Sequence, residues 1–577
     1  MLATFDINKS TFEITDSGLA YNRIYDRAGN IVNANTQLPF GSISRLCSAQ
    51  LIEPNQFGNG IGLTDRIYFT GEEFNNGTEW ALDTATGDLW AAPALGAAAW
   101  ENVTELNTGR TDKVALLIGD DRQGAPLLLY VGTKNPNGNF LQRNGLSNGK
   151  LFVWVADDPT SATDIIEDDP SEFRGTRNSL AGQFVEIAYY RPTLAGTPGY
   201  DALGYATQTT QDALARAVSN FQFSRPEDVS TNPADGTQAV LASTGRAEFA
   251  GGADTWGTTY RIDVNFNNID AAGGITARVD ILYDGNDAGA GQFQGPDFGL
   301  RSPDNLDWSE DGSIYIQEDR STTPATLFGG TSGEEASIWK LNPTNGALTR
   351  IGQINRSAVP TGQTDSRPTD LGNWESSGVL DVSELFGQPA GNLFVFDVQA
   401  HSLTGGPITS GNLVEGGQLS LLSTNRTIIG NARPNRITTF NGNDVVSGGG
   451  GNDIVSAGFG DDLIRGGNGA DSLSAGGGND TIIASAGADI CIGGLGDDVI
   501  RTGLGADLVV IARDSGSDTV RDFNVRAGDK IGLSGGLRFR NLTFSGDDIL
   551  LRGTSEVLVT LTGVNTTTLG RSSFVIV

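Results

Sequence analysis

Eight aspartates recur at intervals of nine residues toward the C-terminal end of the chain: Asp444, Asp453, Asp462, Asp471, Asp480, Asp489, Asp498 and Asp507. Glycine-rich turns precede them, as in Gly466-Gly467-Asn468-Gly469-Ala470-Asp471. Such a turn presents backbone carbonyls and a carboxylate, which are the hard oxygen ligands that calcium prefers. The spacing therefore predicts several calcium ions held between stacked turns, with these eight aspartates as ligands.

An apolar residue stands two positions after every one of these aspartates: Val446, Val455, Ile464, Leu473, Ile482, Cys491, Ile500 and Val509. A glycine-rich flexible linker would not keep that register. A turn followed by a short strand with one inward side chain predicts a narrow parallel β-roll. The pattern G-G-x-G-x-D-x-U-x resembles the RTX calcium-binding repeats. We expect the roll at residues 431–525, followed by a β cap at 526–577.

The RTX resemblance also implies a route out of the cell. Such chains leave through a type I secretion machinery that reads an uncleaved C-terminal signal, and they fold outside, where calcium is abundant. Met1 to Ile7 lacks the basic and apolar segments of a cleaved signal peptide. We therefore expect an extracellular or cell-surface protein.

The composition fits an exported acidic protein. The 577 residues include 69 Asp or Glu against 38 Lys or Arg, a formal charge of −31, which argues against nucleic acid and anionic membranes as partners. Mean hydropathy is −0.20, and no apolar stretch approaches the ~20 residues of a transmembrane segment. Cys491 stands at an apolar repeat position and is expected in the core. A disulfide with the second cysteine, Cys47, is not expected.

Residues 1–430 show short apolar runs separated by turn dipeptides, which predicts an all-β domain. The predicted strands are Lys113 to Ile118, Leu127 to Val131, Leu151 to Val155, Val279 to Tyr283, Ser313 to Ile316, Ile338 to Leu341, Leu393 to Phe396 and Leu419 to Leu422. Only Thr210 to Phe221 has helical spacing. At this length a β-propeller is the most economical architecture, with no visible fixed period to give a blade count.

Short polar strings lie at the ends of these predicted strands. They are Gly41 to Cys47, Tyr68 to Glu73, Leu95-Gly96 with Trp100-Glu101, Gly119 to Arg122, Phe223 to Asp228, Ser302 to Asn305, Trp374 to Gly378 and Phe396 to His401. In this order they resemble the strings of PhoX-type alkaline phosphatases: G-S-x-R-N-C, W-L-T-C-E-E, L-G with H-E, D-D, R-P-E, and E-x-x-G before a strand that ends near Q-H.

The PhoX resemblance implies a propeller whose central pocket holds iron and calcium and hydrolyses small phosphate monoesters. Carried onto this chain, it makes Cys47 a thiolate on iron and Glu101 an iron ligand. The other metal ligands that it implies are Glu72, Glu73, Glu227 and Glu375. It also implies that Arg225 binds the phosphate group of the substrate, so that Arg225 and Glu227 are the expected catalytic residues. Hard carboxylates suit calcium and ferric iron, a thiolate suits iron, and the arginine fork matches phosphate oxygens.

Several departures from the family pattern leave other interpretations open. The asparagine before the cysteine is Leu46, and the paired glycines after it are Ser48 and Ala49. The cysteine of the T-C-E-E string is Gly71, and the histidine before Glu101 is Trp100. One alternative is a surface or adhesion protein without catalytic activity, in which the roll is an anchor made rigid by bound calcium. Another is an enzyme of a different ester class, such as a phosphodiesterase or lactonase.

Individual residues in the strings also have ordinary structural alternatives. Cys47 can be a buried core thiol, and Asp120-Asp121 can be turn residues. Arg225 and Glu227 can form a plain ion pair. His401, the single histidine of the chain, can serve a purely structural role.

Overall fold

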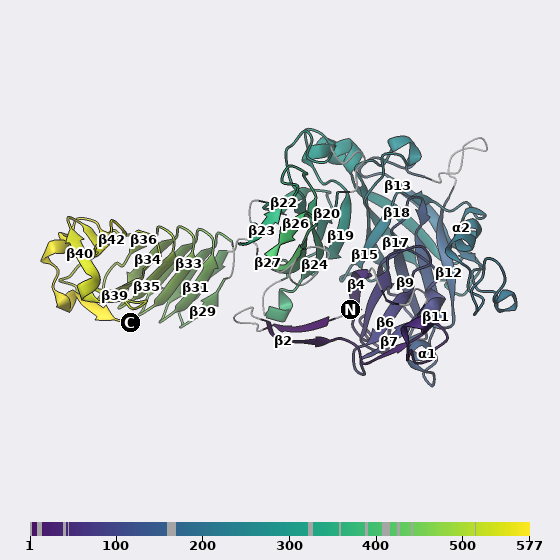
Figure 1. Cartoon of the computed structure of the whole chain (residues 1–577), viewed down its shortest axis with the longest axis horizontal. Coiled ribbons are helices and arrows are strands. Elements are labelled where there is room, and N and C mark those ends of the chain that lie inside the picture. The colour runs from purple at the N-terminus through teal and green to yellow at the C-terminus, as the bar shows by residue number, and fades with distance from the viewer. Residues whose placement is uncertain are drawn as a thin grey trace. The chain divides into compact units, whose positions relative to one another are not determined.

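The computed structural model of the chain is built almost entirely from β-strands, in two compact units, Met1–Leu421 and Leu422–Val577 (Figure 1). The structure describes residues 3–7, 14–38, 42–43, 46–157, 169–320, 327–356, 359–386, 390–406, 416–423, 427–439, 442–513 and 515–577. The side chains of residues 3–7, of Ile14, Cys47 and Ser48, and of several residues in 416–423 lie outside the description. Among the described residues, no helix is both long and apolar enough to cross a membrane.

Two larger sheets begin the first unit. The five-stranded sheet has the order β3 (Arg23–Tyr25), β7 (Asp88–Ala91), β6 (Glu79–Asp83), β5 (Ile67–Glu72) and β4 (Leu46–Ile52). The nine-stranded antiparallel sheet has the order β15 (Pro226–Thr231), β16 (Gln238–Ser243), β17 (Thr258–Asn265), β18 (Thr276–Asp284), β13 (Ser179–Ile187), β12 (Gly149–Ala156), β11 (Leu128–Thr133), β9 (Lys113–Asp120) and β8 (Trp100–Leu106). Apolar clusters around Trp154 and around Trp100 bury the side chains of its strands.

Smaller sheets follow in the first unit. One holds β19 (Pro303–Trp308), β20 (Ile314–Glu318), β21 (Ser337–Leu341) and β22 (Leu348–Gln353), and another holds β24 (Trp374–Asp381), β25 (Leu393–Ala400) and β27 (Gly416–Ser423). Three pairs remain: β1 (Ala3–Ile7) with β2 (Ile14–Leu19), β10 (Ala125–Pro126) with β14 (Gln222–Phe223), and β23 (Gln363–Asp365) with β26 (Leu403–Gly405).

Each predicted strand of this unit overlaps an observed strand, with boundaries that differ by at most four residues; Leu127 and Ser313 lie just before β11 and β20. The predicted helix is shorter than expected. Helix α2 runs from Gln208 to Arg216, because its C-cap is Ala217 and the left-handed Ser219 (φ 57°) turns the chain toward β14. The other α-helices among the described residues are the single turns α1 (Phe140–Arg143) and α3 (Ala288–Gly291).

The second unit is the predicted parallel β-roll. One sheet stacks β28 (Thr427–Ile429), β30 (Val445–Gly450), β32 (Leu463–Asn468), β34 (Thr481–Ala486), β36 (Val499–Arg501) and β38 (Asp518–Val520), and ends in β42 (Val557–Leu561), β41 (Asp548–Leu551) and β40 (Leu542–Ser545). The other stacks β29 (Arg436–Thr438), β31 (Ile454–Phe459), β33 (Ser472–Gly477), β35 (Ile490–Leu495), β37 (Leu508–Ile511), β39 (Lys530–Leu533) and β43 (Phe574–Ile576) (Figure 1).

The apolar repeat positions form the core of the roll, as the sequence predicts. Ile464 pairs with Ile482 in one sheet and Leu473 with Cys491 in the other, and all four are completely buried. Cys491 is a free, buried thiol, as expected for a core position. Each turn of the roll takes 18 residues, and small residues such as Ala457, Ala475 and Ala484 join the apolar repeat positions in the core.

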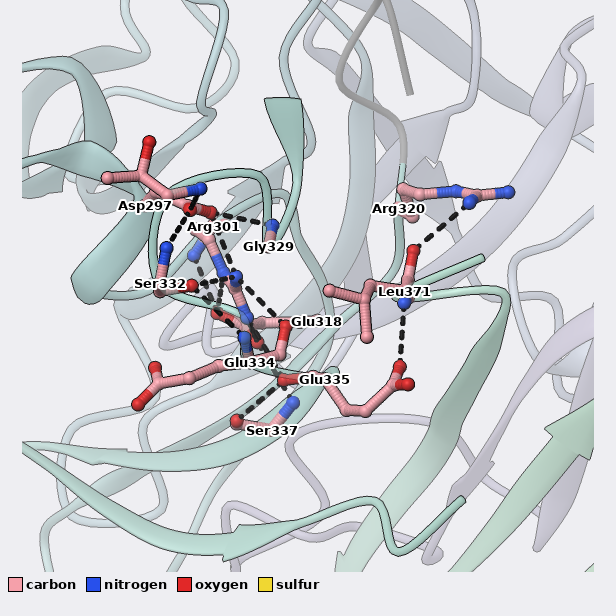
Figure 2. A network of polar contacts seen from close by, with 12 residues as sticks. Asp297, Arg301, Glu318, Arg320, Gly329, Ser332, Glu334, Glu335, Ser337 and Leu371 are labelled. Atoms are coloured by element: carbon pink, nitrogen blue, oxygen red, sulfur yellow. Dashed lines mark hydrogen bonds and ion pairs between the residues drawn. The ribbon is translucent and has the colours of Figure 1, made fainter. Parts of the chain in front are cut away.

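A fully buried arginine fastens the four-stranded sheet of the first unit (Figure 2). Arg301 Nη1 donates to Asp297 Oδ1 (3.0 Å), Nη2 donates to Glu318 Oε2 (3.1 Å), and the guanidinium carbon lies 3.8 Å from the centre of the Phe328 ring. Asp297 also accepts three backbone N–H groups between Gly329 and Ser332. The two carboxylates are therefore buried with Arg301 as their shared counter-ion.

We expect Arg301→Met to destabilise the first unit by about 3–5 kcal/mol, since it leaves Asp297 and Glu318 buried without a cation. Urea unfolding followed by tryptophan fluorescence measures this. The matched control is Arg278→Met, because Arg278 is 53% exposed in its ion pair with Asp280 and should cost about 1 kcal/mol or less. Equal losses in the two variants would contradict the assignment.

Candidate functional site

A cavity of about 370 Å³ lies where strands from four sheets of the first unit end. Carboxylates dominate its lining: Glu73, Glu101, Asp121, Glu227, Asp304, Asp319 and Glu375. The remaining lining residues are Leu46, Arg225, Asn305, Ser377, Gln399 and His401. The polar strings of the sequence therefore meet in one place, although they span more than half of the chain.

Three of these carboxylates lie close enough to share a cation. Glu101 on β8, Asp121 directly after β9 and Glu227 on β15 each offer an oxygen, and the three oxygens lie within 4.8 Å of one another. Glu101 and Glu227 are 2% exposed. Buried carboxylates at this spacing are a typical oxygen-ligand set for a hard cation.

A β-bulge turns the acids toward the cavity in three strands: β8 and β15 of the nine-stranded sheet and β19 of the four-stranded sheet. Glu101 and Asn102 lie opposite one residue of β9, Glu227 and Asp228 opposite one residue of β16, and Asp304 with the residue after it opposite one residue of β20. Two residues against one bend the strand and turn its side chains. At each of these three bulges the sequence has an acid, followed by a polar residue and then by a buried aliphatic residue.

The same two-against-one pairing occurs in β4, where Cys47 and Ser48 lie opposite Gly71. The backbone of Cys47 thus holds the register position that Glu101 and Glu227 hold in their strands. Its side chain lies outside the described residues, so its predicted role as an iron ligand stays a prediction.

The carboxylates raise one another's pKa. Burial raises the pKa of Glu101 well above its ordinary value, and the nearby charges of Glu227, Asp121 and Glu73 raise it further. Burial likewise raises the pKa of Glu227, against the opposing effect of Arg225, and burial raises that of Asp304. The cavity therefore has a strong deficit of positive charge, which a bound cation would relieve.

Arg225 supplies part of the missing charge. Its Nε contacts Asp121 Oδ1, and its Nη2 lies 3.0 Å from Glu227 Oε1. The ion pair that is the ordinary structural alternative for Arg225 and Glu227 is thus present, and both residues line the cavity. At the other side of the lining, His401 Nε2 and Glu375 Oε1 lie 2.7 Å apart.

The structure brings together most of the site residues predicted from the sequence. Glu73, Glu101, Arg225, Glu227 and Glu375 line the cavity. Glu72 does not: it is buried at the end of β5, where its Oε2 accepts the N–H of Thr78 (3.3 Å).

Sequence reasoning did not single out three other acids of the lining. Asp121 and Asp304 were visible within the polar strings, where a turn is the ordinary explanation of an aspartate. Asp319 directly follows β20 and carries no motif of its own.

Two of the departures from the PhoX pattern lie beside each other and outside the cavity lining. A Cβ atom on Gly71 would lie 2.0 Å from Cβ of Trp100, so this backbone leaves no room for a side chain at position 71. Trp100 is buried and donates from Nε1 to Gly77 O (2.9 Å), and neither residue lines the cavity. Leu46, in contrast, does line it and places an aliphatic side chain where the family pattern has an amide.

The repeat aspartates of the roll form two carboxylate ladders, one along each edge. From Asp462 to Asp507, each Oδ1 accepts the backbone N–H of the aspartate 18 residues earlier, for example Asp462 N to Asp480 Oδ1 (2.7 Å) and Asp471 N to Asp489 Oδ1 (2.8 Å). Within the described residues, the buried Oδ2 atoms of Asp453, Asp462, Asp471, Asp480, Asp489, Asp498 and Asp507 have no hydrogen-bond partner. A buried carboxylate oxygen is costly without a partner, so this row fits a row of cations.

The ladders extend past the eight predicted aspartates. Asn435 N donates to Asp453 Oδ1 (2.7 Å) at the start, and at the end Asp498 N donates to Asp518 Oδ1 (3.3 Å) and Asp507 N to Asp529 Oδ1 (3.1 Å). Spacings of 20 and 22 residues at Asp518 and Asp529 hide these two positions from a strict nine-residue search.

These ladders give the calcium-free roll a defined pH dependence. Burial raises the pKa of Asp462 and Asp489 to about 6, that of Asp480 to about 7 and that of Asp518 to about 8. An unfolded aspartate has a pKa of about 3.9. Between these values the folded roll binds more protons than the unfolded chain, so its stability falls as pH rises from about 4 to 8.

We therefore expect acidification to restore strand structure to the calcium-free roll. Far-UV circular dichroism in chelator should show more strand at pH 5 than at pH 8. With saturating calcium the difference should vanish, because bound cations take the place of the protons. A calcium-free roll that is better folded at pH 8 would contradict the ladder electrostatics.

Comparison with known proteins identifies the C-terminal unit. Residues 427–455, 456–491 and 474–509 match the RTX calcium-binding nonapeptide repeat family. This chain carries RTX repeats. No curated protein sequence matches the chain.

Several solved structures resemble parts of the chain, all at low identity. PhoX of Pseudomonas fluorescens in complex with vanadate, a transition state analogue, is 17% identical with a TM-score of 0.40; the match covers 60% of this chain and 57% of that one. The extracellular lipase LipA of Serratia marcescens is 20% identical (TM-score 0.15; 26% of this chain, 40% of LipA). TolB of Acinetobacter baumannii is 12% identical (TM-score 0.19; 63% and 65%). Both resemblances expected from the sequence, RTX repeats and PhoX, are therefore found.

Proposed function

We propose that the first unit hydrolyses phosphate monoesters with the aid of cations bound in its acidic cavity, and that the RTX roll is its calcium-dependent secretion module. The observation that carries this proposal is the buried set of Glu101, Asp121 and Glu227, whose oxygens lie within 4.8 Å beside Arg225. The PhoX-like order of the polar strings supports the choice of substrate class.

In this proposal the residues of the cavity have two roles, cation binding and binding of the phosphoryl group. Glu101, Asp121 and Glu227 hold the cations, with Glu73, Asp304, Asp319 and Glu375 as further oxygen donors. Cations held there would supply Lewis-acid stabilisation of the phosphoryl oxygens. They would also compensate Asp121 and Glu227, which frees the guanidinium fork of Arg225 to bind the phosphoryl group.

The donor set fits calcium on oxygen chemistry alone. Among the described side chains of the cavity, every acidic ligand is a carboxylate, which suits calcium and equally suits ferric iron. We propose iron as a second metal with Cys47 as its thiolate ligand, because its backbone holds the same bulge position as the acids. Metal analysis of a Cys47→Ser variant tests this.

We also propose that the sheets around the cavity are blades of a β-propeller with β8, β15, β19 and β24 as inner strands. Adjacent inner strands are joined by side chains: Thr104 Oγ1 and Thr231 Oγ1 lie 2.7 Å apart, and Ser230 Oγ accepts the N–H of Trp308 (3.1 Å). Type I export to the cell surface or medium completes the proposal, because RTX repeats are typical of proteins that leave by that route.

Purified, calcium-loaded protein tests the activity directly. We expect release of phosphate from p-nitrophenyl phosphate and from an alkyl phosphate at alkaline pH, with loss of activity in chelator and recovery on adding calcium. Iron content is measured on the same sample. Cleavage of a phosphodiester or lactone, with no monoesterase activity, would move the proposal to the other ester class.

The silent surface module is the second candidate, and Leu46 favours it. An aliphatic side chain in the lining removes a polar donor where charge develops in phosphoryl transfer. Calcium without iron, together with no hydrolysis of any monoester, would decide for this candidate.

A further inference from the structure

One buried carboxylate outside the cavity lining joins three strands that carry cavity acids. Asp228 Oδ1 accepts from the Asn102 amide on β8 and from Val229 N on its own strand, β15 (2.8 Å). Its Oδ2 accepts from Leu306 N on β19 (2.9 Å). Asp228 is 4% exposed, so these protein donors are its main stabilising contacts.

The β-bulges place every one of these contacts next to a cavity acid. Asp228 follows Glu227, Asn102 follows Glu101, and Leu306 lies two residues after Asp304. In each bulge the first residue faces the cavity, and in β8 and β15 the second meets the neighbouring strand. The Asp228 carboxylate is therefore the shared anchor of Glu101, Glu227 and Asp304.

Only an ionised carboxylate suits this position. All three groups that face it are donors: one amide N–H and two backbone N–H groups. An asparagine would offer one acceptor oxygen and would turn an NH₂ group toward another donor. Asn102 has its own oxygen occupied by Val103 N (2.7 Å), so it cannot simply flip.

We propose that Asp228 is a positioning residue that sets the separation of Glu101, Glu227 and Asp304 and thereby the cation affinity of the cavity. This rests on the proposed metal-binding function of the cavity. Residues that orient metal ligands typically change metal affinity by about 10–100-fold when they are replaced.

The placement of the aromatic residues allows a readout that is specific to the cavity. All eight tryptophans and all eleven tyrosines precede residue 422, and the RTX unit has none. Terbium, a luminescent substitute for calcium, is excited through nearby tryptophan, and Trp100 and Trp374 directly precede Glu101 and Glu375. Tryptophan-excited terbium luminescence of the full chain should therefore report the cavity, and a Glu101→Gln/Glu227→Gln variant shows how much of the signal comes from it.

We expect Asp228→Asn to weaken terbium binding at the cavity by about 10–100-fold. The matched control is Asp284→Asn, because Asp284 is equally buried and accepts two backbone N–H groups, from Gly175 and Asn286, but does not line the cavity. It should cost stability without changing terbium affinity. Intrinsic tryptophan emission verifies that both variants are folded.

A compensating swap separates positioning from general damage. In Asn102→Asp/Asp228→Asn the amide at 228 donates to the carboxylate at 102, and its oxygen accepts from Leu306 N, which restores both links between strands. We expect this double variant to recover most of the lost affinity at unchanged net charge. This rescue also covers the case in which Asp228→Asn alone fails to fold.

Three results would overturn the proposal: wild-type affinity in Asp228→Asn, no recovery in the swap, or an equal loss in Asp284→Asn. If the Glu101→Gln/Glu227→Gln variant keeps the full terbium signal, the cavity is not a metal site and the proposed function fails with the inference. If terbium binding follows the expected order but no monoester is cleaved, only the hydrolase assignment fails.

Discussion

Removing calcium from the full-length chain is expected to unfold the RTX roll while the first unit stays folded. Without cations, each edge of the roll stacks carboxylates whose buried Oδ2 atoms have no partner among the described residues, as at Asp471 and Asp480. Ligand binding to the folded state is then the main source of stability. Far-UV circular dichroism should lose strand signal in chelator and recover it in millimolar calcium.

The first unit provides an internal control for that experiment. Because all tryptophans lie before residue 422, their emission reports the first unit alone. We expect it to change little under chelation, and magnesium should not replace calcium in the roll, because it demands a tighter octahedral shell. A roll that keeps its strands in chelator at pH 8, or one that unfolds together with the tryptophan signal, would refute this account.

The sequence predicts the roll in detail because local chemistry determines it. Each turn needs glycine at left-handed positions, such as Gly467 (φ 109°), where a Cβ would lie 2.1 Å from the carbonyl of Gly449. The side chain at the apolar position can then point only into the core, as the side chains of Leu473 and Cys491 do. Where the repeat length changes, at Asp518 and Asp529, the periodic signal ends although the ladder continues.

The cavity is less predictable, because it depends on contacts between distant segments. Single strings such as Asp120-Asp121 look like turns, and only the fold shows that Asp121 meets Glu101 and Glu227. The resemblance supplied Glu73, Glu101, Arg225, Glu227 and Glu375, since their order along the chain was informative. It could not tell that Glu72 turns toward Thr78, because neighbouring residues of a strand end have no fixed direction in a sequence.

The structure also separates the departures from the family pattern by their consequences. Gly71 and Trp100 do not line the cavity, and a Cβ atom at Gly71 would lie 2.0 Å from Cβ of Trp100. Leu46 lines the cavity. We therefore expect Leu46 to affect the chemistry of the cavity more than Gly71 and Trp100 do.

Glu101→Gln is expected to lower phosphatase turnover by about 100-fold or more and, in the absence of metal, to stabilise the first unit. Burial holds the pKa of Glu101 well above its ordinary value, and the nearby charges of Glu227, Asp121 and Glu73 raise it further. Ionised Glu101 is therefore unfavourable without metal and essential with it. Removing a metal ligand costs at least what loss of an orienting partner costs, about 10–100-fold in metal affinity.

The sign of the stability change follows from proton linkage. A carboxyl whose folded pKa is raised loses stability as pH rises from its unfolded pKa of about 4.3 through its folded pKa. Glutamine mimics the protonated form at every pH, so metal-free Glu101→Gln should unfold at a higher temperature than wild type at pH 8. At pH 4 the two should be nearly equal. In calcium the order should reverse, because only the wild type gains from ligand binding.

Glu79→Gln is the matched control for this reversal. Glu79 on β6 is as deeply buried, and burial alone raises its pKa, but it does not line the cavity. Its replacement should stabilise the first unit both with and without metal and should leave turnover and terbium binding unchanged. A Glu101→Gln protein that keeps wild-type turnover, or that is less stable than wild type without metal, would show that Glu101 is not a cation ligand. The opposite responses to calcium in the two glutamate variants distinguish a metal-binding carboxylate from one that is merely buried.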